Sequence, residues 1–137
     1  VCRGRGEQIE PVNIGGPLYV VVVRPPEGLL TGDVYAACRP ADRARPVTPL
    51  VDALKEGALR SVGNLLHNRL QVAAEGLSPA INRMKRAFES LDFVGHQMSG
   101  SGTSYFGICR HARHARRMRA CVEARGIGTA YTVATRP

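Results

Sequence analysis

The sequence contains no tryptophan, and its aromatic residues are limited to four tyrosines and three phenylalanines. It also lacks long apolar runs: the longest, Leu18 to Val23, has six residues, whereas a membrane-spanning helix needs about 20. We therefore expect no membrane partner. The chain has no secretory signal at its start and opens with Val1-Cys2 rather than methionine, so we expect it to be a piece of a longer protein.

Paired cysteine motifs are absent as well. The four cysteines (Cys2, Cys38, Cys109 and Cys121) are widely spaced, and no two of them form a C-x-x-C pair. In a chain of this size without secretory signals, such spacing favours free thiols in a reducing compartment. The sequence therefore predicts a cytoplasmic protein without disulfide bonds.

Lysine is scarce, and most of the 19 basic residues are arginine. Since the acidic residues number only 11, the formal net charge is +8. The one dense basic cluster is Arg110 to Arg119. If this stretch is helical, Ala112, Ala115, Met118 and Val122 form an apolar stripe and most arginines lie elsewhere, as on the solvated face of a packed helix. The cluster contains no aromatic residue for base stacking. We therefore expect no nucleic-acid partner.

The length of 137 residues fits one domain, or one lobe of a larger protein. β-branched runs and alternation predict strands at 7–14, 18–25, 93–98, 104–110 and 128–136. Apolar spacing of three and four residues predicts helices at 31–39, 49–56, 58–77, 79–92 and 112–126. Pro79, after Ser78, is a typical first helical residue.

The order of these elements indicates the fold class. Helices between strands that can pair antiparallel argue for an α+β layer. The final strand, loop, strand, helix and strand fit a split βαβ unit. The sequence therefore predicts a ferredoxin-like antiparallel sheet with helices packed on one face.

The stretch "QMSGSGTSYFGIC" contains the most unusual loop of the chain, formed by Ser99, Gly100, Ser101, Gly102 and Thr103. Glycines and hydroxyls of this kind can cradle a phosphate with backbone N–H groups. However, the loop lacks the Gly-Lys-Ser/Thr of a P-loop and the third glycine of a dinucleotide fingerprint. It also leads into a strand rather than a helix, so no helix dipole assists. The pattern alone favours a hairpin turn over a cradle.

Other groups of polar residues offer weaker candidates. Cys109, His111 and His114 resemble part of a metal site, but no fourth ligand is apparent and the spacing is not typical of zinc. We expect no metal there. His67–Asn68 lies in an apolar-striped helix, which favours a buried hydrogen-bonded pair over catalysis. His96 could titrate near neutral pH, but no acidic residue adjoins it, and no catalytic triad can be assigned.

Several stretches together resemble the GHMP kinases, which are two-lobed small-molecule kinases. "MSGSGTSYFGI" is similar to their third glycine-rich motif. "GRGEQIEPV", "YVVVVRPPEGLLTGDVY" and "LLHNRLQVAAEGLSPAINRMKRAF" resemble, in the same order, segments of the branch that phosphorylates the 2-hydroxyl of 4-diphosphocytidyl-2-C-methyl-D-erythritol in non-mevalonate isoprenoid biosynthesis. The resemblance covers nearly the whole chain.

The resemblance implies that residues 16–137 are the C-terminal domain and residues 1–15 end a strand or linker of the N-terminal lobe. That lobe would be the partner, and it would carry the main phosphate loop and the catalytic Lys and Asp. The complete enzyme would use ATP and Mg²⁺ on a cytidylyl substrate, and this chain alone would be inactive. The resemblance places the 99–103 loop at the interlobe cleft and Thr31, more weakly, on the substrate side.

Two departures from the family pattern are Arg69, where an acidic residue is usual, and Thr103, where Pro or Ala is common. Both leave the substrate contacts open. Alternatives are another GHMP kinase, such as a homoserine or mevalonate kinase, or a stand-alone ferredoxin-like binding or regulatory module. If the strand at 7–14 lacks its partner lobe, its unpaired edge would favour a dimer of fragments.

Overall fold

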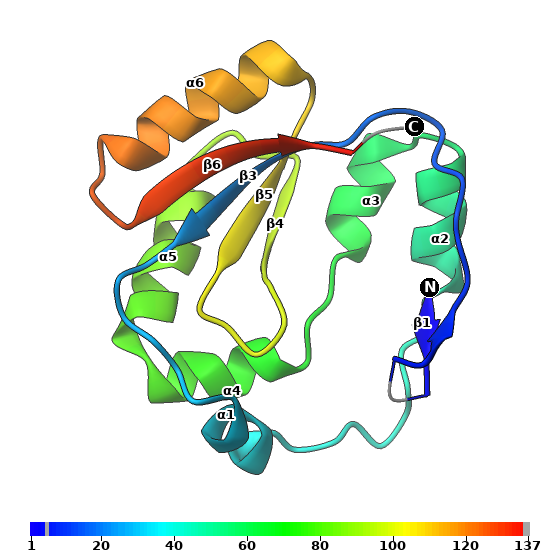
Figure 1. Cartoon of the computed structure of the whole chain (residues 1–137), viewed down its shortest axis with the longest axis horizontal. Coiled ribbons are helices and arrows are strands. Elements are labelled where there is room, and N and C mark those ends of the chain that lie inside the picture. The colour runs from blue at the N-terminus through cyan, green and yellow to red at the C-terminus, as the bar shows by residue number, and fades with distance from the viewer. Residues whose placement is uncertain (5, 136–137) are drawn as a thin grey trace.

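A four-stranded antiparallel sheet lies at the centre of the computed structural model, which describes residues 1–4 and 6–135. Its strands are β3 (Tyr19–Arg24), β4 (Gly95–Met98), β5 (Tyr105–Cys109) and β6 (Thr129–Ala134). Their order is β4-β5-β3-β6 (Figure 1). Because β3 lies between β5 and β6, the segment from β5 to β6 is a split βαβ unit. The predicted ferredoxin-like sheet is confirmed; the part of the predicted last strand at Arg136 falls outside the described residues.

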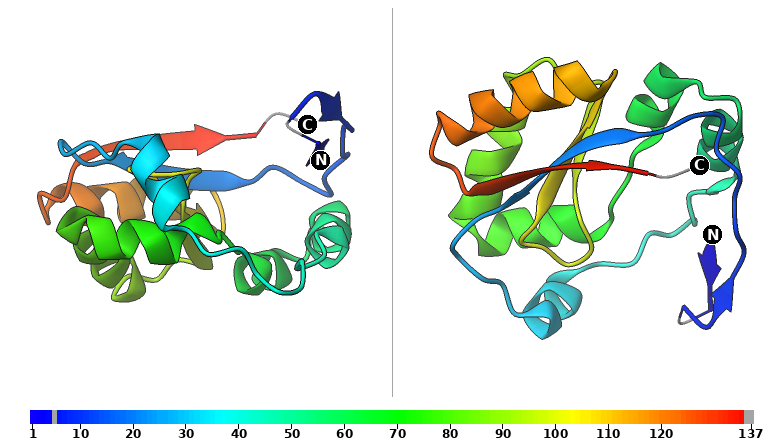
Figure 2. Two further views of the ribbon diagram at one scale, coloured as in Figure 1. Left: turned by 90° about the horizontal axis from the view of Figure 1, so that it is seen from below. Right: turned by 45° about the horizontal axis from the view of Figure 1, so that its top comes forward.

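Six helices accompany the sheet within the described residues. They are α1 (Thr31–Ala37), α2 (Thr48–Lys55), α3 (Leu59–Leu65), α4 (Leu70–Leu77), α5 (Pro79–Glu89) and α6 (Ala112–Glu123). Helices α4, α5 and α6 lie on one side of the strands (Figure 2, left). None of the helices in the described part is both long and apolar enough to span a bilayer. The α+β prediction is confirmed.

The main core forms between the sheet and these helices. Val21 and Val23 of β3 are fully buried, as are Ile81 and Phe88 of α5 and Val122 of α6. All five belong to one cluster, as expected where one face of a strand and one stripe of each helix turn inward. The apolar stripes of helices α5 and α6 therefore face the sheet.

A smaller second core involves the alternate residues of β5. Tyr105 and Cys109 belong to the main cluster, whereas Ile108 packs with Ala53 of α2 and Val62 of α3. Because neighbouring strand residues point to opposite faces, the α2–α3 pair packs on β5 side chains that the main helix layer does not reach. The layer predicted on one face is thus supplemented by a second helical pair.

Helix α3 approaches β4 with backbone rather than side chains. A Cβ added to Gly63 would lie 2.3 Å from the carbonyl oxygen of Val94, and one added to Gly95 would lie 2.4 Å from the Cα of Gly63. Real Cβ atoms do not come this close, so both positions require glycine. This contact fixes the end of α3 against the first residue of β4.

Two predicted elements differ from the structure. The helix predicted at 58–77 is divided into α3 and α4, because Leu66 has an extended conformation with ψ 133°. The strand predicted at 7–14 is reduced to β2 (Gln8–Ile9), which pairs with β1 (Cys2–Arg3) in a short hairpin. All four cysteines are free, as predicted.

Candidate functional site

The β4–β5 connection is a tight hydrogen-bonded turn. The Ser99 amide donates to the Ser104 carbonyl at 2.8 Å, and the Gly102 amide donates to the Ser99 carbonyl at 3.0 Å. Gly100 and Gly102 have φ of 57° and 95°, which is left-handed backbone that glycine adopts at low cost. The hairpin turn expected from the pattern is therefore present.

The same turn leaves hydrogen-bond donors unused. Within residues 1–4 and 6–135, no acceptor is found for the backbone N–H groups of Gly100, Ser101 and Thr103. Backbone N–H groups gathered in a glycine-rich turn form a concavity suited to anions. The turn and the cradle are thus compatible readings of one loop.

Asn68 binds the 99–103 loop and the residue before it through backbone carbonyls. Its Nδ2 donates to the carbonyl oxygens of Met98 at 2.9 Å and Gly100 at 2.7 Å. Its Oδ1 accepts from the amide of Leu70 at 3.0 Å, at the start of α4. The break between α3 and α4 therefore places one side chain against the loop, and that side chain has both of its polar atoms engaged.

Two further side chains support the loop. The Oε1 of Gln71 accepts from the amide of Met98 at 3.0 Å, and the Oγ1 of Thr31 lies 3.0 Å from the Oγ of Ser101. Thr31 does not cap α1, whose N-cap is Leu30 without a side-chain bond. The structure thus brings Thr31 to the loop, together with Asn68 and Gln71, which the sequence did not assign to it.

Within the described residues, neither His96, which precedes the loop in sequence, nor His67, which precedes Asn68, has a hydrogen bond to residues 99–103. The Nδ1 of His96 lies 3.0 Å from the Oη of Tyr105, and burial lowers the pKa of His96 and raises that of Tyr105 to about 12. His67 is exposed, so the prediction of a buried His67–Asn68 pair is wrong for His67, because the helix that would have buried it ends before it.

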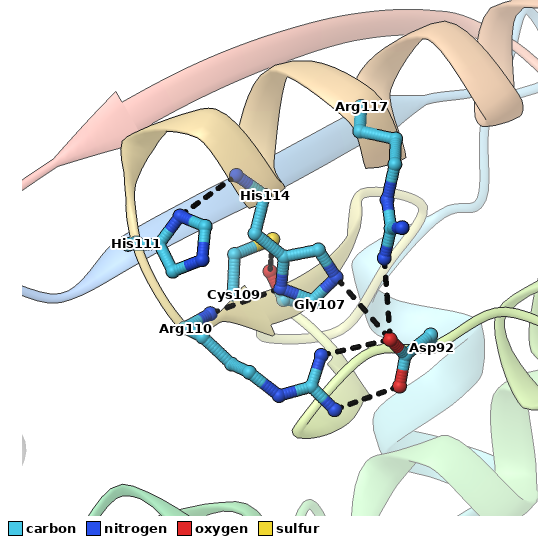
Figure 3. Close-up of polar contacts among 7 residues, drawn as sticks. All are labelled: Asp92, Gly107, Cys109, Arg110, His111, His114 and Arg117. Atoms are coloured by element: carbon cyan, nitrogen blue, oxygen red, sulfur yellow. Dashed lines mark hydrogen bonds and ion pairs between the residues drawn. The ribbon is translucent and has the colours of Figure 1, made fainter.

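The opposite end of the β4–β5 hairpin carries ionised side chains (Figure 3). Asp92 accepts from the two terminal nitrogens of Arg110 at 2.7 and 2.8 Å, and from Arg117 at 3.2 Å. The hydrogen bonds of Arg110 lower the pKa of Asp92 to about 2. These charges pair with one another and tie the α5–β4 connection to α6.

The cysteine and histidines considered as metal ligands are either buried or hydrogen-bonded to nearby backbone. His111 Nδ1 accepts from the His114 amide, and His114 Nδ1 accepts from the Arg110 amide, both at 3.1 Å. Cys109 is buried, which raises the pKa of its thiol to about 11. No group of three His, Cys, Asp or Glu side chains suited to a metal is found among the described residues.

The arginines of α6 point away from its buried stripe. Ala115, Met118 and Val122 are buried as predicted, and His114 joins them. Arg119 pairs with Glu123 one turn later at 2.7 Å, and Arg117 pairs with Asp92. This is the solvated face that the sequence predicts.

Comparison with known proteins decides the family. The model of the "GHMP kinases C terminal" family matches residues 50–128, a segment that runs from α2 to the end of the α6–β6 connection and contains the loop. The chain belongs to the GHMP kinase family. The resemblance seen in the sequence is confirmed, and the matched segment is the C-terminal domain.

Individual GHMP kinases are similar over most of this chain. It is 35% identical over 109 residues to 4-diphosphocytidyl-2-C-methyl-D-erythritol kinase of Shouchella clausii, covering 79% of this chain and 37% of that protein. It is 35% identical over 133 residues to the same-named kinase of Thermobifida fusca, covering 92% and 42%. The chain therefore spans about two fifths of the length of these relatives.

A solved GHMP kinase shows the same fold. The crystal structure of 4-(cytidine 5'-diphospho)-2C-methyl-D-erythritol kinase has a TM-score of 0.78 and 32% identity, covering 97% of this chain and 48% of that one. The structural match thus extends over nearly the whole of this chain and about half of that kinase.

The sequence indicated Asn68 only in part. It placed this residue in an amphipathic helix, because Leu59, Val62, Leu66 and Leu70 keep helical spacing across it. The available signal was local: Asn favours helix ends over helix interiors, since its side chain bonds nearby backbone. That preference predicts an end near Asn68, whereas its contact with the loop depends on the tertiary fold.

Proposed function

We propose that the protein is an ATP-dependent kinase that phosphorylates the 2-hydroxyl of 4-diphosphocytidyl-2-C-methyl-D-erythritol, and that this chain supplies one wall of its active site. The observation that carries the proposal is the 99–103 loop, in which the amides of Gly100, Ser101 and Thr103 have no acceptor among residues 1–4 and 6–135. The names of the relatives with 35% identity support the choice of substrate.

The loop suits phosphoryl transfer because that chemistry depends mainly on positioning and on stabilising negative charge. Backbone N–H groups of Gly100 and Ser101 would donate to phosphate oxygens, and the hydroxyls of Ser99, Ser101 and Thr103 would add donors. ATP fits such a donor set. Residues 99–104 contain no carboxylate that could bind Mg²⁺, and we place the ligands of Mg²⁺ and the catalytic groups in the N-terminal lobe, as the family resemblance implies.

The remaining assignments follow from the same proposal. Residues 16–137 would form the C-terminal domain, and residues 1–15 would belong to the connection with the N-terminal lobe, which would be the partner of this chain. Thr31 would lie on the substrate side of the loop, since it contacts Ser101. The enzyme would act in the cytoplasm. Dimerisation of this chain alone stays a prediction, to be checked by its mass in solution.

The test measures phosphoryl transfer with ATP, Mg²⁺ and three acceptors: 4-diphosphocytidyl-2-C-methyl-D-erythritol, homoserine and mevalonate. We expect the full protein that contains this chain to produce ADP with the cytidylyl acceptor only. We expect the isolated chain to produce none with any acceptor, because its loop is a single wall.

Two outcomes would contradict the proposal. Transfer to homoserine or mevalonate in preference to the cytidylyl acceptor would assign another GHMP kinase activity. Turnover by the pure chain, purified away from any longer form, would refute the division of the active site between two parts of the protein.

A further inference from the structure

The break between α3 and α4 gives Asn68 a fixed orientation. The Leu70 amide, 3.0 Å from Oδ1, identifies that atom as the acceptor, because an N–H cannot donate to the NH₂ of the side chain. Nδ2 then faces the carbonyls of Met98 and Gly100. The opposite flip would place an oxygen against two carbonyl oxygens, so a single orientation satisfies all three bonds.

The bond to the Gly100 carbonyl determines where the next amide points. The peptide that joins Gly100 to Ser101 is trans, and in a trans peptide the C=O and the following N–H point in opposite directions. Since the Gly100 carbonyl is 2.7 Å from Asn68 Nδ2, the Ser101 N–H points away from Asn68. This is one of the amides without an acceptor in the described part of the chain.

The Met98 carbonyl shows the same geometry as the Gly100 carbonyl. It is also held by Asn68 Nδ2, at 2.9 Å, and the following amide, that of Ser99, points across the turn to Ser104. One side chain thus orients two peptide groups in alternate positions. The first closes the turn, and the second turns a donor outward.

We propose that Asn68 is a positioning residue for phosphoryl transfer: it aligns the Ser101 amide with a phosphate oxygen of ATP. The inference rests on the proposed function. Asn68 bonds to the Gly100 carbonyl, so it would act on the phosphate through the Ser101 peptide rather than by direct contact. Its contribution is orientation, and a small rotation of a donor peptide is costly in catalysis.

The test is Asn68→Asp in the full protein. Aspartate keeps the shape and the acceptor for Leu70 but replaces the donor with an oxygen that repels the Gly100 carbonyl. The matched control is Asn64→Asp, on the exposed side of α3. We expect kcat per folded molecule of N68D to fall by about 100-fold, with the KM for the acceptor substrate unchanged, whereas N64D should keep the kcat of the parent.

The split between kcat and KM separates orientation from a purely structural role. If the loss of activity in N68D disappears after correction for the folded fraction, or if kcat equals that of the parent, the proposal is overturned. If the parent protein transfers no phosphate, the proposed function fails instead. The inference is then decided by the Ser101 amide resonance during titration with ATP: a shift in the parent that N68D lacks supports it, and no shift in the parent overturns it.

Discussion

The two ends of the β4–β5 hairpin are built from different chemistry. At one end, neutral side chains such as Asn68 and Thr31 hold a loop through its carbonyls and hydroxyls. At the other end, Asp92 gathers two guanidinium groups. The first arrangement leaves three backbone N–H groups without an acceptor in the described part of the chain, whereas the second pairs opposite charges with each other.

This difference shows which polar cluster is a candidate for ligand binding. In a sequence with a net charge of +8, charged clusters are natural candidates for anion binding. Here, however, the guanidinium groups of Arg110 and Arg117 are paired with Asp92, and exposed ion pairs of this kind contribute little to stability. The loop has no charged side chain at residues 99–104, so an anion would be bound there by backbone N–H groups. The end of the hairpin that we propose as functional is therefore the less charged one.

The strongest way to break the loop end is Gly102→Ala. A Cβ there would lie 3.2 Å from Met98 Sδ and 3.5 Å from Leu29 Cδ1, at a φ of 95°. We expect stability to fall by about 1–3 kcal/mol and activity of the full protein by about 100-fold or more, measured by urea unfolding and ADP release. The control is Gly100→Ala, whose Cβ meets nothing within 4 Å and should cost about 1 kcal/mol. Equal effects of the two changes would refute the role of close packing under Gly102.

A smaller effect is expected from Thr31→Val, which keeps the shape and removes the contact with the Ser101 hydroxyl. One neutral hydrogen bond is worth about 1 kcal/mol, so kcat/KM of the full protein should fall about fivefold. Thr48→Val at the exposed start of α2 is the matched control and should leave kcat/KM unchanged. A loss of the same size in both variants would show that Thr31 has no specific part in the loop.

The smallest effect on activity is expected from Asp92→Asn, because the charged end takes no part in the proposed transfer. We expect unchanged kcat/KM and a lower melting temperature at neutral pH. The pKa of Asp92 is lowered from 3.8 to about 2, so its folded state binds fewer protons than its unfolded state across that range. The stabilisation is therefore present above about pH 4, and the difference between parent and D92N should disappear as the pH falls to about 2.

Asp92→Asn also tests the comparison itself. A loss of activity as large as that of Thr31→Val, in protein that remains folded, would show that both ends of the hairpin contribute to the reaction. The distinction between a functional neutral end and a structural charged end would then be wrong.

The sequence predicted the elements that local patterns determine. The start of α5 at Pro79, the strand at β3 and the turn at 99–103 all follow from residue spacing, from a β-branched run and from glycine or proline positions. It failed at Leu66 to Arg69, where helical spacing continues but the backbone does not. There, hydrogen bonds from Asn68 to a distant loop outweigh helix propensity, and propensity is a weak predictor against tertiary contacts.

The loop illustrates the same limit at the level of the site. The sequence indicated Gly100 and Gly102, but the side chain that binds the Gly100 carbonyl comes from residue 68, and the one that contacts the Ser101 hydroxyl comes from residue 31. The glycines could be predicted from the local pattern, whereas the contact of Asn68 could not, because it joins residues far apart along the chain. Phosphate binding by this loop stays a prediction.

The glycine contact between α3 and β4 bears on how the active site would close. Gly63 and Gly95 bring the two backbones together, and five residues later Asn68 is bonded to the loop that follows β4. Helix α3, its C-terminal break and the hairpin are thus joined at two points. We expect them to move as one rigid unit. Closure around a substrate would then be a rotation of the proposed N-terminal lobe toward this domain, while the 99–103 loop keeps its position within the domain.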